Sequence, residues 1–373
     1  MRKIPAILAI LIITLCGCAP EPPKKNFDDL AIVGSMDLRY AQQFNVDYLA
    51  DGCSLISINE SGRYLLVPAG QTPPLQVAQD ITVLSQPLEN IYLAATSAMC
   101  LFDALEGLEQ ITLSGTKAEG WYIENARTAM ETGAIVYAGK YSAPDYELLL
   151  TQNCGLAIES TMINHVPNVK EKLESLGIPV MVERSSYEPH PLGRTEWIKL
   201  YGLLLNKNEA ALKLFTEQTA YIDSIPPQKT EKSVAFFYIS SSGSAVVRKS
   251  GDYIAKMIEL AGGIYVFSDL GNADSAAGAV NLEMERFYAA AVEADIIIYN
   301  SSIDGEIHSI DELLAKNHLL ADFKAVKNGN IWCTGKNFFQ ETTGFGLVIW
   351  DMYRIFNEDL AGLDELNYLY RLR

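Results

Sequence analysis

The chain has 373 residues, of which 49% are hydrophobic and 10% aromatic, and its formal net charge is −17. This apolar content excludes a disordered chain, and the acidic balance argues against nucleic-acid binding, because nucleic acids attract basic surfaces. The length exceeds one ordinary hydrophobic core, so we expect two lobes of roughly 150 residues each.

Residues 1–18 have the pattern of a secretory signal: Arg2 and Lys3 precede an apolar run that ends in Leu15-Cys16-Gly17-Cys18. The Leu-x-Gly-Cys ending resembles a bacterial lipobox, in which Cys18 would receive a diacylglyceryl group and become the mature N-terminus. The alternative, an uncleaved transmembrane anchor, would need about 20 apolar residues, which is more than this run provides. The sequence therefore predicts a lipid-anchored domain on the extracytoplasmic face of the cell membrane, in a periplasm or at a cell surface. Residues 19–30 would form its tether.

The chain contains 6 cysteines, of which Cys16 would leave with the signal and Cys18 would carry the lipid. The remaining four show no close metal-binding spacing, and four thiols allow three disulfide connectivities. We interpret most of them as small buried apolar residues. They are Cys53, Cys100, Cys154 and Cys333.

Residues 31–190 predict an N-terminal α/β lobe that begins with a β-meander over residues 31–67. A Gly- and Pro-rich loop follows, and strands then alternate with helices, which is typical of a Rossmann-like lobe with a mostly parallel sheet. The expected strands are residues 81–84, 110–113, 135–137, 156–158 and 180–182, and the expected helices are residues 95–105, 123–131, 146–152 and 169–176.

Residues 191–227 predict a connector helix, because apolar side chains recur at intervals of three and four and Pro226-Pro227 ends the pattern. Asn206-Lys207-Asn208 can interrupt this helix, so two abutting helices are an open alternative. Residues 228–373 then predict a second α/β lobe. Two matched segments, residues 142–159 and 283–300, each run from an acidic residue through a helix into a buried strand, so the lobes share one pattern.

The order of several motifs resembles the class III substrate-binding proteins of bacterial ABC importers, a periplasmic-binding-protein family for iron-siderophores, haem and cobalamin. The resemblance extends over residues 44–356. It implies two Rossmann-like lobes joined by a long rigid connector helix, a shallow ligand cleft between them, and one glutamate at each lobe's outer tip that pairs with permease arginines. The motifs that carry it are residues 137–147, 194–198, 251–254 with 261–263, 285–288 with 294–299, and 323–329.

By this resemblance, Glu147 takes the first docking position and Glu285 the second, with Glu283 as a close competitor. A carboxylate at a helix N-terminus is favoured by the helix dipole, and a charge at a rim can steer a partner. The alternative is that these are ordinary acids at helix starts, and Arg286 could neutralise Glu285.

Ligands of open α/β sheets lie at the carboxyl ends of the strands, which selects the loops that follow the predicted strands. Aromatic side chains there suit a macrocycle or a catecholate, and cationic side chains suit the negative charge of an iron chelate or haem propionates. The ligand-binding candidates are Lys140, Tyr141, Trp121, Tyr122, Tyr187, Arg248, Lys249 and Phe338.

A bare-metal site is not predicted, because the four histidines share no ligand-like spacing. Tyr187, Glu188 and His190 form a partial set, which the flanking prolines mark as a structural turn. The chain also lacks the Gly-x-Ser-x-Gly elbow, the phosphate-binding loop and the His-Glu-x-x-His helix, so we expect neither an enzyme nor catalytic residues.

The sequence thus predicts a receptor without an intrinsic cofactor, whose ligand is an iron-siderophore in first place and haem or a corrinoid such as cobalamin next. Its expected partners are an ABC permease and the associated ATPase, the chelate itself, and the membrane through the lipid anchor. Two alternatives stay open: a surface lipoprotein that relays haem or corrinoid without transport, and a receptor for a free metal.

Overall fold

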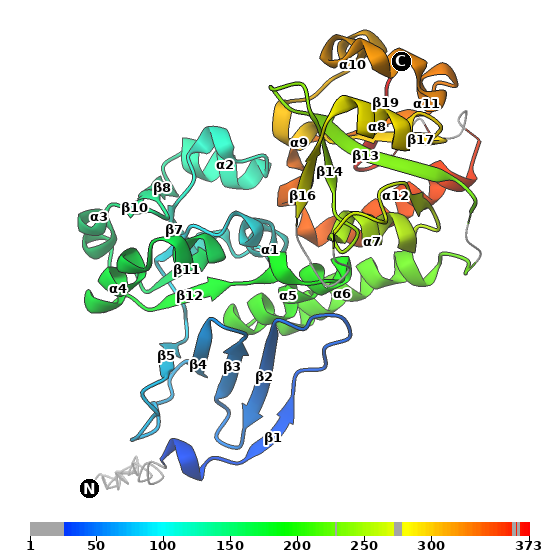
Figure 1. The fold of residues 1–373 in the computed structure, drawn as a ribbon. Coiled ribbons are helices and arrows are strands. Elements are labelled where there is room, and N and C mark those ends of the chain that lie inside the picture. Colours follow the sequence, from blue (N-terminus) through cyan, green and yellow to red (C-terminus); the bar gives the residue numbers. More distant parts are fainter. Residues whose placement is uncertain (1–25, 228–229, 272–277, 360–362, 364–365) are drawn as a thin grey trace, which may run out of the picture.

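The computed structural model describes residues 26–227, 230–271, 278–359, 363 and 366–373. It shows an N-terminal sheet, two α/β lobes and two helices between the lobes (Figure 1). The predicted signal peptide, Cys18 and most of the predicted tether lie outside the described residues. Among the helices that are described, none is both long enough and apolar enough to cross a membrane.

The β-meander predicted for residues 31–67 is present as four strands, and a fifth strand joins its sheet. The fifth strand is β5, which pairs in parallel with β4, so the assignment of residues 81–84 to the Rossmann-like lobe was wrong. β5 is only partly buried, whereas β6, the strand that takes its place, is fully buried as parallel sheets require. The five strands are β1 (Ile32–Ser35), β2 (Phe44–Leu49), β3 (Ser54–Ile58), β4 (Gly62–Val67) and β5 (Ile81–Ser85).

The N-terminal sheet is attached to the start of the connector through its inner face and through the segment of residues 39–43. Phe44 on this face packs edge-on against Trp197, with ring centroids 4.9 Å apart. The carboxylate of Glu196 accepts the backbone N–H groups of residues 39–41 at 2.7 to 2.9 Å. The carboxylate of Glu188 accepts those of residues 42 and 43 at 2.8 and 2.9 Å.

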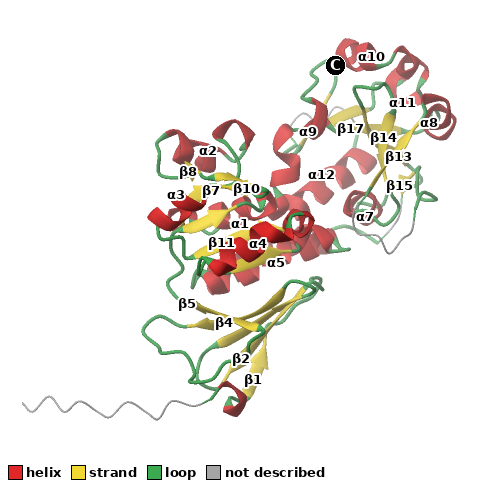
Figure 2. Ribbon diagram, turned by 60° about the vertical axis from the view of Figure 1, so that its left-hand side comes forward, coloured by secondary structure: helices red, strands yellow, loops and turns green. Residues whose placement is uncertain are grey.

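The first lobe contains a parallel five-stranded sheet in the order β12-β11-β6-β7-β8, as the alternation of strands and helices predicts. One face packs against α1 and the following connector, and the other packs against α3 and α4 (Figure 2). The strands are β6 (Ile91–Leu93), β7 (Ile111–Ser114), β8 (Val136–Tyr137), β11 (Leu156–Ser160) and β12 (Val180–Glu183), and the helices are α1 (Met99–Ala104), α2 (Glu124–Glu131), α3 (Tyr146–Thr151) and α4 (Pro167–Ser175).

The connector consists of two helices, α5 (Pro191–Leu204) and α6 (Asn208–Asp223), which is the alternative that the sequence left open. Asn206 adopts a left-handed conformation with φ of 56°, which stops α5. Lys207 fixes the turn because its ammonium donates to the carbonyl oxygens of Leu105 and Glu106 at 2.7 and 2.8 Å. Gly202 lies against Ala211, so the two helices approach closely beside the turn.

The second lobe contains a seven-stranded sheet in the order β16-β14-β13-β17-β18-β19, with β15 added at the start of β13. β13, β17 and β18 are parallel, and β14, β16 and β19 run antiparallel to their neighbours. The strands are β13 (Ser233–Ile239), β14 (Ala245–Arg248), β15 (Ile264–Tyr265), β16 (Ala279–Leu282), β17 (Ile296–Tyr299), β18 (Ile331–Thr334) and β19 (Leu369–Arg371).

The helices of the second lobe link it to the connector and repeat a unit of the first lobe. Gly346 near the start of α12 lies against the backbone of Gln218 in α6, which brings these helices into close contact. The unit α8 followed by β17 corresponds to α3 followed by β11, as the matched segments predict. The helices are α7 (Tyr253–Leu260), α8 (Met284–Ala291), α9 (Ser301–Asp304), α10 (Ile310–Lys316), α11 (Lys324–Lys327) and α12 (Phe345–Asn357).

The four cysteines expected in the mature chain are free thiols, and all are buried. This agrees with their interpretation as small apolar residues. Burial raises the pKa of the Cys53 thiol to about 12 and that of the Cys100 thiol to about 11. Thiols with such pKa values carry little thiolate at neutral pH and are poor nucleophiles.

Candidate functional site

The two lobes meet where the segment between β18 and α12 contacts the first lobe. Gln340 is only 1% exposed, and its amide donates to the carbonyl oxygen of Gly120 at 2.8 Å. Its amide oxygen accepts the backbone N–H of Tyr122 at 2.9 Å. Close by, the Thr195 hydroxyl donates to the carbonyl oxygen of Thr342 at 2.7 Å. We call these five residues the inter-lobe junction.

Two large aromatic side chains lie beside this junction and remain accessible. Tyr122 of the first lobe is 39% exposed and Phe339 of the second lobe is 38% exposed. Their rings meet edge to face, with centroids 6.1 Å apart. An aromatic pair that draws one ring from each lobe is suited to contact a flat ligand held between the lobes.

Phe338 and Phe339 both lie in a loop that follows a predicted strand, and the prediction favoured Phe338 over Phe339. Phe338 is 2% exposed and packs against Phe236 and Phe345, so its ring lies in the core of the second lobe. Both residues belong to the 3-10 helix Lys336–Gln340, where adjacent side chains point in different directions. Two adjacent phenylalanines in the sequence indicate that one ring is accessible to solvent, but they do not indicate which of the two it is.

Trp121, another predicted ligand residue, is also buried. Its side chain is 1% exposed and belongs to the core of the first lobe. The indole N–H donates to the Ser114 hydroxyl at 3.2 Å, which satisfies its polar group inside the protein. Tyr122, the next residue, carries the accessible ring.

A second group of polar side chains gathers where α5 and α7 begin. The Arg194 guanidinium lies over the Tyr253 ring, 3.7 Å from the centroid, and donates to the carbonyl oxygen of Ser186 at 2.6 Å. Glu183, at the end of β12, accepts from Ser97 at 2.7 Å and from the backbone N–H of Ser185 at 2.8 Å. Burial raises the pKa of Glu183 and lowers that of Arg194, and each charge partly offsets this shift in the other.

Arg248, one of the predicted ligand-binding cations, borders this group and not the Ser/Gly loop of residues 240–244 that precedes β14. β14 runs antiparallel to β13, so its end at Arg248 lies away from the loop of residues 240–244. The Arg248 guanidinium lies 3.7 Å from the Asp252 carboxylate, and its side chain is 23% exposed. The stem of Lys249 lies against Gly271 and Gly278, and its backbone N–H donates to the carbonyl oxygen of Gly278.

Tyr187 and the pair Lys140 and Tyr141 lie on opposite sides of the first lobe. Tyr187 follows β12, is 43% exposed, and has the Arg184 guanidinium 4.7 Å from its ring centroid. Lys140 belongs to the hairpin of β9 (Gly139–Lys140) and β10 (Ala143–Pro144), and Tyr141 lies in its turn beyond β8. β12 and β8 are the two edge strands, so four strand spacings of about 4.8 Å separate them by roughly 19 Å. The structure therefore does not bring these candidates into one small site.

The predicted docking acids occupy matching positions in the two lobes. Glu147 lies in the first turn of α3, whose N-cap Asp145 bonds through its N–H to Ala138 at the carboxyl end of β8. Glu285 lies in the first turn of α8, and Glu283 is its N-cap residue after β16. β8 and β16 are edge strands of their sheets. The carboxylates of these three glutamates are exposed and form no ion pair with any described residue.

Of the partial set of Tyr187, Glu188 and His190, the last two have structural roles. Besides its two backbone donors, Glu188 accepts the Trp197 indole N–H at 2.9 Å. The His190 ring accepts the backbone N–H of Leu192 and caps α5. Burial, aided by the nearby cations Lys256 and Arg39, lowers the pKa of His190 to about 4, so the ring is neutral at neutral pH.

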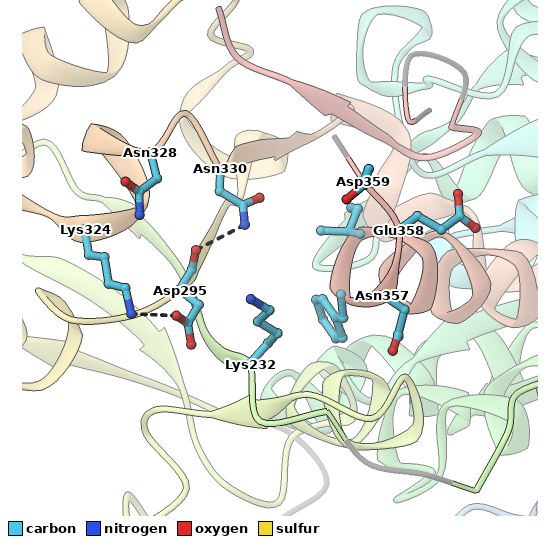
Figure 3. A pocket seen from close by; sticks show the side chains of 10 residues that line it. Lys232, Asp295, Lys324, Asn328, Asn330, Asn357, Glu358 and Asp359 are labelled. Carbon is cyan, nitrogen blue, oxygen red and sulfur yellow. Dashed lines mark hydrogen bonds and ion pairs between the residues drawn. The ribbon is translucent and has the colours of Figure 1, made fainter. Parts of the chain in front are cut away.

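A cavity of about 550 Å³ lies in the second lobe (Figure 3). Lys232, Asp295 and Asn330 each directly precede a strand, so they mark the amino edge of the sheet. Asp295 accepts from Ser233 at 2.9 Å and from Lys324 at 2.7 Å. These contacts tie the strands together, and we do not assign the ligand to this cavity.

Two α/β lobes with parallel central strands, bridged by helices that pack on both, define a class III periplasmic binding protein. The family model described as "Periplasmic binding protein" matches residues 101–337. The chain belongs to this family.

Comparison with individual proteins supports the fold and extends the likeness to the N-terminal region. The chain is 23% identical to the lipoprotein MJ0878 of Methanocaldococcus jannaschii over 91% of this chain and 89% of that protein. The periplasmic haem-binding protein HutB of Vibrio cholerae is 19% identical with a TM-score of 0.57, over 70% of this chain and 97% of HutB. The catecholate-siderophore binding protein VctP of Vibrio cholerae is 14% identical with a TM-score of 0.56, over 72% and 94%.

Proposed function

We propose that this chain is a lipid-anchored substrate-binding protein of an ABC importer, which captures a metal chelate between its lobes and performs no bond chemistry. The observation that carries the proposal is the accessible pair of Tyr122 and Phe339, one ring from each lobe. Membership of the periplasmic binding protein family supports transport, and the likeness to a lipoprotein supports the anchor. An iron-siderophore ranks first as ligand, followed by haem and cobalamin.

The cation that would complement an anionic chelate is Arg248, which lies next to the cluster of Arg194, Tyr253 and Glu183. Arg248 is partly exposed, and Nη1 of its guanidinium faces Asp252. The other N–H groups of the guanidinium can therefore donate to a ligand. Tyr187 approaches the same group from the first lobe, because the carbonyl of its neighbour Ser186 binds Arg194. We propose that the ligand extends from the aromatic pair toward Arg248 and Tyr187, with Lys249 at the periphery. Lys140 and Tyr141 would then contact only a large ligand.

Thermal unfolding in the presence of ferric siderophores, haemin, cobalamin and free metal salts tests the proposal. A ligand at a hundred times its dissociation constant stabilises the folded chain by about 2.7 kcal/mol, so one chelate class is expected to raise the melting temperature. Absorbance titration of the same samples measures the affinity. Tyr122→Ala with Phe339→Ala is expected to weaken binding at least about tenfold, because each lost aromatic contact is worth roughly 1 kcal/mol.

The matched control is Leu212→Ala, which removes an exposed apolar side chain from α6 on the outside of the connector. It is expected to bind like the unmodified chain. A response to a free metal alone would instead support the alternative receptor, and a lack of response to every chelate would refute the proposed ligand class.

Glu147 and Glu285 are proposed to dock the receptor on the permease. Reversing both charges, Glu147→Lys with Glu285→Lys, is expected to leave chelate binding unchanged and to reduce permease-dependent uptake by roughly 700-fold or more, since about 1.4 kcal/mol corresponds to a factor of ten. Each lost pair of charges in such an interface costs 2 kcal/mol or more. Uptake of labelled chelate by cells or by vesicles that contain the permease measures this effect.

Glu171→Lys with Glu209→Lys makes the same change of charge at exposed positions on α4 and α6 and is expected to retain uptake. Glu283→Lys alone distinguishes the two acids at the start of α8. Full uptake by the double reversal at Glu147 and Glu285 would refute the docking role of these acids, whereas a lack of permease-dependent uptake by the unmodified chain would favour the non-transport relay.

A further inference from the structure

The N-terminal sheet has an outer layer that faces away from the first lobe. Leu49, Leu55 and Val67 form a small core on the outer face of the sheet, separate from the inner face that packs on α5. Phe27 and Val77 pack against this core, because the segments on either side of the sheet fold over it. The backbone N–H of Phe27 donates to the carbonyl oxygen of Gln76 at 3.0 Å, which joins the two segments.

This outer layer exposes apolar side chains. Ile32 and Val33 on the edge strand β1 are 59% and 66% exposed, and Leu75 in the loop before β5 is 64% exposed. Leu75 directly precedes Gln76, so it lies beside the N-terminal segment that leads into β1. We call these three residues the apolar patch. Ile32 pairs with Leu49 of the outer core, and Leu75 adjoins the segment that covers this core, so the apolar patch borders the outer face of the sheet.

The chain leaves the described residues at this same end. The 3-10 helix Phe27–Asp29 and β1 lie at the end of the molecule that is opposite the second lobe (Figure 1). Eight residue steps separate Cys18 from Asn26. At no more than about 3.6 Å per residue, a lipid on Cys18 holds Asn26 within roughly 29 Å of the bilayer surface.

We infer that the apolar patch rests on the membrane surface, so that the N-terminal sheet orients the lobes above the bilayer. This inference rests on the proposed lipid anchor at Cys18. The exposed acids Asp28, Asp29 and Asp51 surround the patch, and Asp80 is paired with Arg63. The contact is therefore apolar, and it favours a neutral lipid surface over an anionic one.

Fluorescence quenching by spin-labelled lipids tests this contact on the full lipidated chain in phosphatidylcholine vesicles. The native cysteines of the described chain are buried, so Val33→Cys and Leu75→Cys provide selective labelling sites. Leu212→Cys on α6, where the native side chain is 56% exposed, is the matched control. Side chains at the level of the headgroups should be quenched at least about twofold more strongly than the control. Adding phosphatidylglycerol should reduce the difference.

Equal quenching at the three labelled positions would overturn the inference. A further variant separates apolar contact from mere proximity through the tether. Ile32→Asp with Leu75→Asp should lower the quenching of a label at Val33→Cys to the level of the control, and unchanged quenching would also overturn the inference.

Mass spectrometry of the same protein separates this inference from the proposed anchor. Absence of the lipid on Cys18 would refute the anchor only. The labelled variants are then attached to the vesicles by an N-terminal hexahistidine tag that binds a nickel-chelating lipid. Their quenching is compared as before, and the same outcomes support or overturn the contact of the apolar patch with the membrane.

Discussion

Glu188→Ala is expected to destabilise the folded chain by about 3 kcal/mol. The substitution leaves three donors without their acceptor, namely the backbone N–H groups of Gln42 and Gln43 and the indole N–H of Trp197. An unsatisfied buried donor costs about 1 to 3 kcal/mol, and Trp197 is fully buried, whereas water can reach the backbone at Gln42. Urea unfolding measures the loss of stability from the shift of the midpoint at constant slope.

Hydrogen exchange shows where that loss acts. The N-terminal sheet is held by Glu188, Glu196 and its inner face, so amides of β2 and β3 are expected to exchange faster in Glu188→Ala than amides of β17. Glu188→Gln keeps one acceptor oxygen but directs an amide group at a donor. Its stability should therefore lie between those of the unmodified chain and of Glu188→Ala. Glu171→Ala on the exposed face of α4 is the control, expected within about 0.5 kcal/mol of the unmodified chain. A Glu188→Ala variant as stable as this control would contradict the structural role.

The stability of the chain is expected to fall as the pH rises from about 4.5 to about 8, through the carboxyl group of Glu159. This residue on β11 is fully buried, and neither oxygen has a hydrogen-bond partner among the described residues. Burial raises its pKa from 4.5 to about 8. The folded chain therefore retains a proton that the unfolded chain releases, and each pH unit within this window removes about 1.4 kcal/mol from this group's contribution. Above pH 8 the effect is constant.

Glu159→Gln isolates this effect because it cannot ionise. The variant and the unmodified chain are expected to differ little near the lower end of the window, and the variant is expected to be more stable by several kcal/mol near pH 8. Urea unfolding of both proteins across the window gives the difference, from which all other titrating groups cancel. A difference that does not change with pH would show that the buried carboxyl finds a partner.

Local patterns were sufficient for most elements of the fold. The helix and strand around Glu147 and those around Glu285 were predicted because an apolar helix face and a fully buried strand leave separate signals. β5 was misassigned because a short apolar run indicates a strand but does not indicate which strand it pairs with. Tertiary contacts decide that pairing. The turn at Asn206 was only an alternative, because an asparagine can adopt either a helical or a left-handed conformation and the local sequence does not decide between them.

The candidate site was harder to predict than the fold. Residue type and loop position selected Trp121 and Phe338, but both are buried while their neighbours Tyr122 and Phe339 are exposed. A sequence pattern cannot resolve which of two adjacent rings faces the core of a loop or a 3-10 helix. Gln340 was missed for another reason: an amide side chain gives no chemical signal until the structure shows the backbone groups that it binds.

The contacts of Gln340 also affect how a ligand would be received. Its amide binds backbone groups of the opposite lobe, so the spacing of the lobes at the junction is set before any ligand arrives. Binding to such a preorganised receptor requires less ordering of loops and side chains, and more of the contact energy therefore appears as affinity.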